Sequence, residues 1–250
     1  MDVMGASMTN SMTGSASLRV SGLAKTFTLH NQGGAVLPVF GALCLDVFPG
    51  ECVVLAGPSG AGKSTLMRSI YANYRASAGQ VLVRHGGRMV DLATAPPQEV
   101  IAVRRATLGF VGQFLRVIPR VPTIDIVMEP LLANGWGPEA ARARAEALLR
   151  RLNLPERLWP LAPATFSGGE QQRVNVARGF AFPCPVMLLD EPTAALDPAN
   201  REVVVALIRE ALADHVAIVG IFHDREVRDR VATRAFAIGD YAPEALPGIG

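Results

Sequence analysis

A glycine-rich stretch at residues 57–64 has the composition and spacing of a phosphate-binding loop. It reads GPSGAGKS and fits the pattern G-x-x-x-x-G-K-[ST] at every position. Its glycines let the backbone wrap a polyphosphate, so that the amides from Gly60 to Thr65 can donate to phosphate oxygens. Lys63 can reach the β- and γ-phosphates, and the Ser64 hydroxyl can hold Mg²⁺. We therefore predict a nucleoside triphosphate site formed by Gly57, Pro58, Ser59, Gly60, Ala61, Gly62, Lys63, Ser64 and Thr65.

Two adjacent carboxylates follow the apolar run VMLL at residues 186–189. A strand that ends in Asp190 would place this carboxylate beside the phosphates, where it can position Mg²⁺ through water. Glu191 comes next, at a point suited to orient and polarise an attacking water. Alone, the pair would indicate only a charged strand end. Together with the loop at 57–64, it predicts hydrolysis of the triphosphate.

A second stretch, FSGGEQQRVNVARGF at 166–180, also has the features of a phosphate-binding surface. A serine and two glycines lead into an amphipathic run, as at the start of a helix. Free backbone N–H groups and the positive end of the helix dipole favour an anion at such a point. The chain therefore has two phosphate-binding sequences, far apart, and a reason for the second is needed.

The segments around these motifs alternate between strand-like and helix-like patterns. Apolar, β-branched runs at 51–57, 108–112, 185–192 and 216–222 are separated by helical patterns, which implies parallel strands joined by helical crossovers. Short strand-like runs at 17–50 and a hairpin pattern about Gly86–Gly87 predict a small antiparallel β-lobe. Ala, Arg and Leu recur at helical spacing over 138–154 and predict an inserted helical lobe.

The predicted fold is therefore of the α/β class, with a parallel sheet core, a small antiparallel β-lobe and an inserted helical lobe. We assign residues 17–112 and 177–240 to the core with its β-lobe, and residues 113–176 to the helical lobe. Residues 1–16 are small, polar and rich in methionine, so we expect a disordered N-terminal tail there. Residues 241–250 are assigned to a C-terminal tail.

The composition narrows the class of protein. Hydrophobic residues make up 50% of the chain, as in a folded protein, and a net charge of +2 is too small to favour nucleic acid as a partner. The three cysteines Cys44, Cys52 and Cys184 are odd in number and far apart, so we expect buried, reduced thiols. No apolar run approaches the ~18–20 residues that cross a bilayer, so we predict a cytoplasmic protein without membrane insertion.

The stretch FSGGEQQRVNVAR resembles the signature peptide of the ATP-binding-cassette (ABC) ATPases, and other motifs of that family surround it in family order. Gln113, after LGFVG, resembles the glutamine of the Q-loop. Asp197, in ALDPA, resembles the D-loop aspartate, and His223 resembles the switch histidine. Phe27 resembles the aromatic residue that stacks on adenine; a strand aromatic packed into the β-lobe is the alternative. Glu170 stands where the commonest signature has Gln.

The resemblance implies a P-loop NTPase fold with ATP and Mg²⁺ as ligands. In ABC proteins two cassettes pair head to tail, so that the signature peptide of one covers the γ-phosphate held by the other. The two phosphate-binding sequences of this chain are then halves of two different sites. The implied catalytic residues are Glu191, His223 and Gln113. The implied Mg²⁺ residues are Ser64, Gln113 and Asp190, and the further nucleotide contacts are Phe27, Ser167, Gly168, Gly169, Glu170 and Asp197.

Longer phrases resemble one branch of the family, the L-type ATP-binding subunits (PhnL) of the carbon–phosphorus lyase system. They include RSIYANY (68–74), VGQFLRVIPRVP (111–122) and VGIFHDREVR (219–228). That branch implies a soluble ATPase that works with other lyase subunits in forming α-D-ribose 1-phosphonate 5-triphosphate during phosphonate catabolism. One alternative is the motor of a membrane transporter of the lipoprotein-release or macrolide-exporter type. Another is an ATP-gated clamp whose binding matters more than its turnover.

Overall fold

The computed structural model describes residues 15–29, 33–115 and 119–242, and a five-stranded parallel sheet forms its centre. The sheet has the order β6-β7-β8-β3-β9, and every neighbouring pair is parallel, as the alternation of patterns predicted. The three central strands are apolar and buried because both faces of the sheet are covered there. All five strands are short. They are β3 (Cys52–Ala56), β6 (Leu108–Val111), β7 (Val186–Asp190), β8 (Ala217–Ile221) and β9 (Arg234–Ala237).

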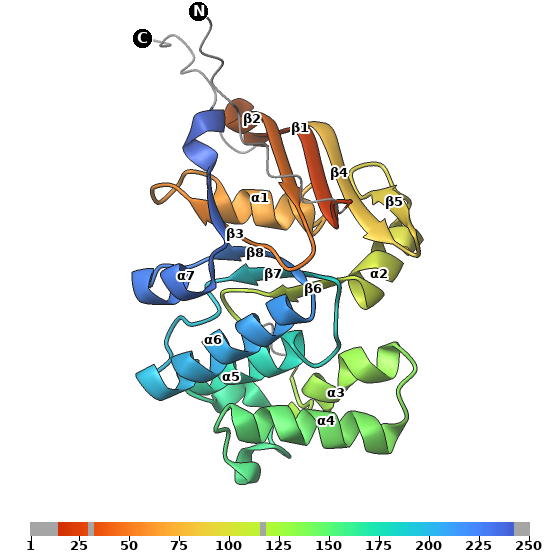
Figure 1. Ribbon diagram of the computed structural model, residues 1–250, viewed down its shortest axis with the longest axis vertical. Helices are drawn as coiled ribbons and strands as arrows, with labels where there is room; N and C mark the ends of the chain where they lie inside the picture. Colours follow the sequence, from red (N-terminus) through yellow and green to blue (C-terminus); the bar gives the residue numbers. More distant parts are fainter. Residues whose placement is uncertain (1–14, 30–32, 116–118, 243–250) are drawn as a thin grey trace, which may run out of the picture.

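Helices cover both faces of this sheet (Figure 1). Alternate residues of β3 separate the two sides: Val53 and Leu55 belong to the core around α1, and Cys52 and Val54 to the core around α5 and α6. The first side carries α1 (Lys63–Ile70) and α2 (Pro97–Ala106). The second side carries α5 (Gly168–Gly179), α6 (Pro198–Ala213) and α7 (Arg225–Val231).

A four-stranded antiparallel sheet with the order β2-β1-β4-β5 lies over α1. It contains β1 (Leu18–Leu29), β2 (Ala35–Val47), β4 (Ala78–His85) and β5 (Arg88–Asp91). The prediction of short strands over 17–50 was wrong, since β1 and β2 have 12 and 13 residues. The register of the two strands shifts at several points between Val20 and Thr26, and the strands stay paired on both sides of these shifts. The hairpin prediction is confirmed, with positive φ values of 54° and 83° at Gly86 and Gly87.

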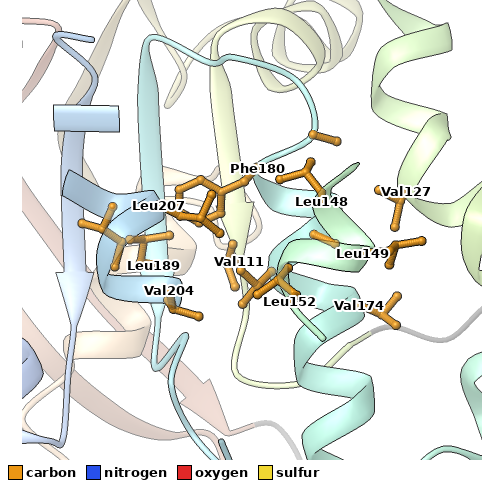
Figure 2. Close-up of a cluster of buried hydrophobic side chains, with 14 of the residues drawn as sticks. Val111, Val127, Leu148, Leu149, Leu152, Val174, Phe180, Leu189, Val204 and Leu207 are labelled. Carbon is orange, nitrogen blue, oxygen red and sulfur yellow. The ribbon is translucent and has the colours of Figure 1, made fainter. Parts of the chain in front are cut away.

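The helical lobe begins with α3 (Thr123–Ala133) and α4 (Pro138–Arg151), which pack together with α5. Figure 2 shows the leucines of α4 beside Val127 of α3 and Val174 of α5, in a cluster that continues to Val111 of β6. Complete burial of such a side chain contributes about 1.5–3 kcal/mol. The lobe and the sheet therefore share one apolar core. The buried residues of α4 are Ala141, Ala145, Leu148 and Leu149.

The packed part of the chain reaches slightly past the predicted boundaries at residues 17 and 240. Ala16 is buried, and Tyr241 ends a 3-10 turn at Ile238–Tyr241 and stacks on Phe236. Two further 3-10 turns, at Glu156–Leu158 and Pro163–Thr165, follow α4. Most of each predicted tail, residues 1–14 and 243–250, lies outside the described residues. Within the described ranges, no helix is long and apolar enough to span a membrane.

The cysteine prediction is correct for two of the three residues. Cys52 and Cys184 are buried free thiols, and burial raises the pKa of each to about 12. Cys44 is also free but exposed, because it lies on the outward face of β2 between the buried Leu43 and Leu45.

Candidate nucleotide-binding site

Residues 57–62 of the 57–65 loop join the end of β3 to α1, and residues 63–65 form the first turn of that helix. This is the strand–loop–helix setting that the sequence requires. The first turn of α1 has no side-chain cap and no acidic residue, so its N–H groups are available to an anion. The Lys63 ammonium donates to the carbonyl oxygens of Gly57 and Pro58 at 2.7 and 2.8 Å. The cation is thus held against the loop, where a phosphate could replace these carbonyl oxygens.

Glycines shape the loop on its inner side. Gly57 and Gly62 have φ values of +148° and +93°, a region that favours glycine. A Cβ at Gly62 would lie 2.7 Å from Cγ1 of Val39, and one at Gly57 would lie 3.1 Å from Cγ2 of Ile238. Gly60 has open space beside it. The loop therefore packs tightly against the protein at two glycines and leaves room at the third.

Asp190 ends β7 next to the loop and carries an unpaired oxygen. The residue is only 2% exposed, and its Oδ1 has no hydrogen-bond partner within the described part of the chain. Burial, and next the charge of Glu191, raise the pKa of Asp190, while Arg68 and the Ser64 hydroxyl act in the opposite direction. A buried carboxylate oxygen beside a serine hydroxyl suits Mg²⁺, which takes one or two carboxylates together with phosphate oxygens and waters. Ser64 and Asp190 would hold this ion, which supplies positive charge to the phosphate oxygens.

Glu191 lies in a polar cluster with the two other predicted catalytic residues. His223 Nε2 is 2.8 Å from Glu191 Oε1, and Gln113 Nε2 donates to Glu191 Oε2 at 3.4 Å. The three side chains follow β7, β8 and β6, whose carboxyl ends meet at one edge of the sheet. A carboxylate that is oriented through both oxygens can accept a proton from a water.

The backbone of Glu191 is in the left-handed region, with φ of +54°. A non-glycine residue there is strained, and such strain concentrates at functional sites. The Glu191 amide donates to the Ile221 carbonyl oxygen at 3.0 Å, and the Glu191 carbonyl oxygen accepts from Gln172 Nε2 at 3.3 Å. Both backbone groups are therefore anchored to neighbouring elements.

The signature sequence forms an ordered helix start. Ser167 caps α5, and its Oγ accepts from the Glu170 amide at 3.3 Å. Glu170 Oε2 accepts from the amide and the hydroxyl of Ser167 at 2.8 Å each, and these bonds hold the pKa of Glu170 below its ordinary value. A Cβ at Gly169 would come within 2.9 Å of the Ala195 carbonyl oxygen, so the helix start packs closely on that loop.

The two predicted phosphate-binding sequences begin helices on opposite sides of the parallel sheet. In Figure 1, α1 lies above the sheet and α5 below it, and the two helices belong to different clusters of buried residues. Gly168, at the start of α5, is exposed and has open space beside it. This arrangement agrees with separate ligands for the two sequences.

Two residues that were predicted to contact the nucleotide, Asp197 and Phe27, make side-chain contacts within the protein. Asp197 caps α6 and accepts from the backbone amide and the side-chain amide of Asn200 at 2.9 and 2.7 Å, which keeps the pKa of Asp197 low. The Phe27 ring packs edge-on against Tyr74 with centroids 5.3 Å apart, and Lys25 Nζ lies 4.4 Å from its centroid. Packing in the β-lobe is the alternative that the sequence left open for Phe27, and its contact with adenine stays a prediction.

Two side-chain amides of α5 were missed by the sequence reasoning. Gln172 and Asn175 are only 4% and 6% exposed, and both donate to backbone carbonyl groups near Gln113 and Glu191. The signal was present as two amides three residues apart on one face of the helix, the second of them between Val174 and Val176.

The fold and the site define the class of protein, an ATP-binding cassette with a P-loop core, an antiparallel β-lobe and a helical lobe. Residues 40–194 match the family model described as ABC transporter. Because this match covers more than half of the chain, the protein belongs to the ABC transporter family.

The relatives include ATP-binding proteins of transport systems. An uncharacterized ABC transporter ATP-binding protein of Mycobacterium tuberculosis is 39% identical over 87% of this chain and 66% of the relative. The lipoprotein-releasing system ATP-binding protein LolD of Maricaulis maris is 41% identical over 83% of this chain and 89% of the relative. The macrolide export ATP-binding/permease protein MacB of Marinobacter nauticus is 38% identical over 84% of this chain, but this spans only 32% of MacB.

Solved structures confirm the predicted fold. The dimeric structure of MJ0796, a bacterial ABC transporter cassette, superposes with a TM-score of 0.79 at 29% identity, over 89% of this chain and 95% of that one. A second dimeric structure of MJ0796, in a post-hydrolysis state bound to ADP and Pi, has a TM-score of 0.78 and the same coverage.

Proposed function

We propose that this chain is the ATP-binding and ATP-hydrolysing subunit of a membrane transporter. The observation that carries the proposal is the contact of Glu191 with His223 and Gln113, directly after the buried and unpaired carboxylate of Asp190. A triphosphate-binding loop, a carboxylate suited to Mg²⁺ and a carboxylate able to accept a proton from water are the groups that ATP hydrolysis needs.

Each residue then has a defined task. The amides of the 57–65 loop bind the triphosphate, and Lys63 transfers its hydrogen bonds from the loop carbonyl groups to phosphate oxygens. Ser64 and Asp190 hold Mg²⁺. Glu191 accepts the proton of the attacking water, while Gln113 and His223 fix the orientation of its carboxylate.

A second cassette completes each site in this proposal. The helix start at Ser167–Gly169 covers the γ-phosphate on the 57–65 loop of the partner, which explains why one chain has two phosphate-binding sequences. The position of α1 and α5 on opposite sides of the sheet supports this arrangement. The dimeric structures of MJ0796 support it too. ATP would close the dimer, and loss of the γ-phosphate contacts would let it open.

A cavity between the core and the helical lobe offers a place for the transporter partner. It has a volume of about 250 Å³ and is lined by residues of α2, β6, α3 and α5, with both basic and apolar side chains. Because β6 leads directly to Gln113, a cytoplasmic helix of a permease seated here would touch the segment that carries this residue. The lining residues that matter for such a helix are Ile101, Arg104, Arg105, Phe110, Arg178 and Phe182.

The competing proposal is the carbon–phosphorus lyase subunit, in which the same ATP site drives a soluble partner. The resemblance of the stretches at 68–74, 111–122 and 219–228 to the L-type subunits supports it. The identity to LolD and MacB favours the transporter instead. We therefore prefer the transporter.

The first test measures ATP affinity and ATP turnover of the wild type and of Lys63→Ala. We expect this variant to lose tight ATP binding, because the polyphosphate loses the nearest cation. Arg142→Ala, an exposed change on α4, is the control and should bind ATP normally. Near-normal ATP affinity of Lys63→Ala would contradict the assignment of the loop. Normal binding with very slow wild-type turnover would favour the ATP-gated clamp.

The second test identifies the partner. Tagged Glu191→Gln protein is recovered from its own cells with ATP and Mg²⁺ present, separately from the membrane and the soluble fractions, and the associated proteins are identified by mass spectrometry. We expect a polytopic permease. Recovery with soluble phosphonate enzymes would replace the transporter with the lyase subunit and leave the ATP site unchanged.

A further inference from the structure

Helix α5 is hydrogen-bonded to the two segments that carry the catalytic side chains. Gln172 Nε2 donates to the carbonyl oxygens of Pro192 at 3.0 Å and of Glu191 at 3.3 Å. Asn175 Nδ2 donates to the carbonyl oxygen of Gly112 at 2.6 Å. The two amides also meet, with Asn175 Nδ2 3.4 Å from Gln172 Oε1.

These contacts lie next to the reacting groups in the chain. Gly112 directly precedes Gln113, and Glu191 is itself the candidate base. A shift of α5 would therefore act on the backbone of both residues. Because Gln172 and Asn175 are buried, a broken bond would leave a donor and a carbonyl group without water, so the helix and the two segments are expected to move together.

The N-terminal start of α5 is the surface proposed to meet the second nucleotide. Ser167 caps the helix, and Gln172 lies just over one turn beyond this cap. Gly169 packs closely against Ala195, within the loop that follows Pro192. One short helix thus links the phosphate-facing start of the signature to the carbonyl groups beside Gln113 and Glu191.

We propose that Gln172 and Asn175 are positioning residues that couple the nucleotide of the second cassette to Glu191 and Gln113 of this one. The inference rests on the proposed function, since it needs the head-to-tail dimer. When α5 closes on the partner's γ-phosphate, the two amides set the backbone of Glu191 and of the 112–113 segment, and the chain's own site becomes competent. In a dimer of two copies of this chain the two sites are equivalent, so each nucleotide favours hydrolysis of the other.

The test uses Gln172→Met and Asn175→Leu, which keep side-chain volume and remove the donating amide. Gln171→Met is the matched control, because Gln171 Nε2 donates to the Phe166 carbonyl oxygen at 3.0 Å from the same helix, away from the catalytic segments. The measurements are the affinity of the single cassette for ATP, kcat, and the Hill coefficient of turnover against ATP concentration.

We expect each of the two variants to lower kcat about tenfold, the effect of one lost buried hydrogen bond on a transition state. The Hill coefficient should fall from above 1 in the wild type towards 1, and ATP affinity should stay within about twofold. Gln171→Met should keep kcat and cooperativity. In a Glu191→Gln background, Gln172→Met should not lower the residual rate further, because the base that Gln172 positions is gone.

Melting temperatures show whether the variants fold, and Gln172→Leu is the second choice, because it also lacks the donor and puts no charge into the buried site. A wild-type Hill coefficient of 1 would overturn the proposal. So would unchanged kcat and cooperativity in the two variants, or an equal loss in Gln171→Met. These results are distinct from failure of the proposed function, which would show as normal ATP binding by Lys63→Ala.

Discussion

The His223 imidazole contacts the Glu191 carboxylate directly, with 2.8 Å between Nε2 and Oε1. The contact follows from the sheet, since β7 and β8 are parallel neighbours whose register pairs Asp190 with Ile221. Residues that follow the ends of such strands are brought together although they are far apart in the sequence. The imidazole side chain is 70% exposed, whereas the Glu191 side chain is only 16% exposed, so His223 covers the carboxylate from the solvent side.

Replacement of His223 by alanine should slow ATP turnover about 10²-fold and leave ATP affinity near normal, because Glu191 loses the group that orients Oε1. The melting temperature should not change, since the histidine side chain is mostly exposed. Steady-state kinetics give the turnover rate, and titration with a fluorescent ATP analogue gives the affinity. His215→Asn is the control, because His215 is exposed and has a positive φ that asparagine tolerates. Full turnover by His223→Ala would contradict its role.

Replacement of Glu191 by glutamine should slow hydrolysis by about 10²–10⁴, the range for a lost general base, and leave ATP binding intact. The variant should also accumulate as a dimer when ATP and Mg²⁺ are added, because the γ-phosphate is no longer removed. Turnover assays and analytical ultracentrifugation measure the two effects. Glu139→Gln, an exposed change at the start of α4, should behave as the wild type. A normal rate in Glu191→Gln would exclude Glu191 as the base.

Replacement of Asp190 by asparagine should stabilise the nucleotide-free protein and remove the stabilisation by ATP and Mg²⁺. Burial raises the pKa of Asp190, so its contribution to stability is present below the unfolded pKa and is lost as the pH rises through the folded pKa. At neutral pH the buried charge therefore destabilises the fold, and asparagine removes that charge.

The expected rise in melting temperature at pH 7 is a few degrees, and the difference from the wild type should shrink as the pH falls towards the folded pKa. Asp214→Asn, which changes an exposed residue at the end of α6, is the control. A lower melting temperature of nucleotide-free Asp190→Asn would contradict the destabilising effect of the buried charge. A full gain in its melting temperature on addition of ATP and Mg²⁺ would contradict the Mg²⁺ assignment.

Much of this architecture could be predicted because local patterns determine it. The strand–loop–helix around Gly57–Thr65, the apolar strand that ends at Asp190 and the leucine face of α4 each depend on residues that are neighbours in the sequence. The register of the parallel sheet was not visible in the sequence itself. The roles of Gln113 and His223 were therefore expected from the resemblance, and their contacts with Glu191 were not predicted.

The amide pair of α5 shows why some contacts of the candidate site could not be predicted from the sequence. Gln172 and Asn175 bond to Pro192 and Gly112, which lie 20 and 63 residues away along the chain. No local pattern shows the acceptors of such bonds, since the acceptors are backbone groups that every residue has. The packing of Phe27 on Tyr74 depends in the same way on a contact between β1 and the segment that follows α1.

Replacement of Glu170 by glutamine should let the ATP-driven dimer form at an ATP concentration several-fold lower. The hydrogen bonds from Ser167 lower the pKa of Glu170, so this carboxylate is ionised at neutral pH. In the proposed dimer its charge faces the triphosphate of the second cassette, and like charges repel. The amide oxygen of glutamine can still accept from Ser167, so the helix cap should persist.

The midpoint is the ATP concentration at which half of the protein is dimeric, and it is measured by sedimentation. The Glu191→Gln protein is used with and without Glu170→Gln, because Glu191→Gln prevents turnover. The difference should shrink as salt is added, since salt screens the repulsion between exposed charges. Glu139→Gln in the same background is the control for loss of one negative charge near a helix start. An unchanged or higher midpoint in Glu170→Gln would show that this carboxylate does not face the nucleotide of the second cassette.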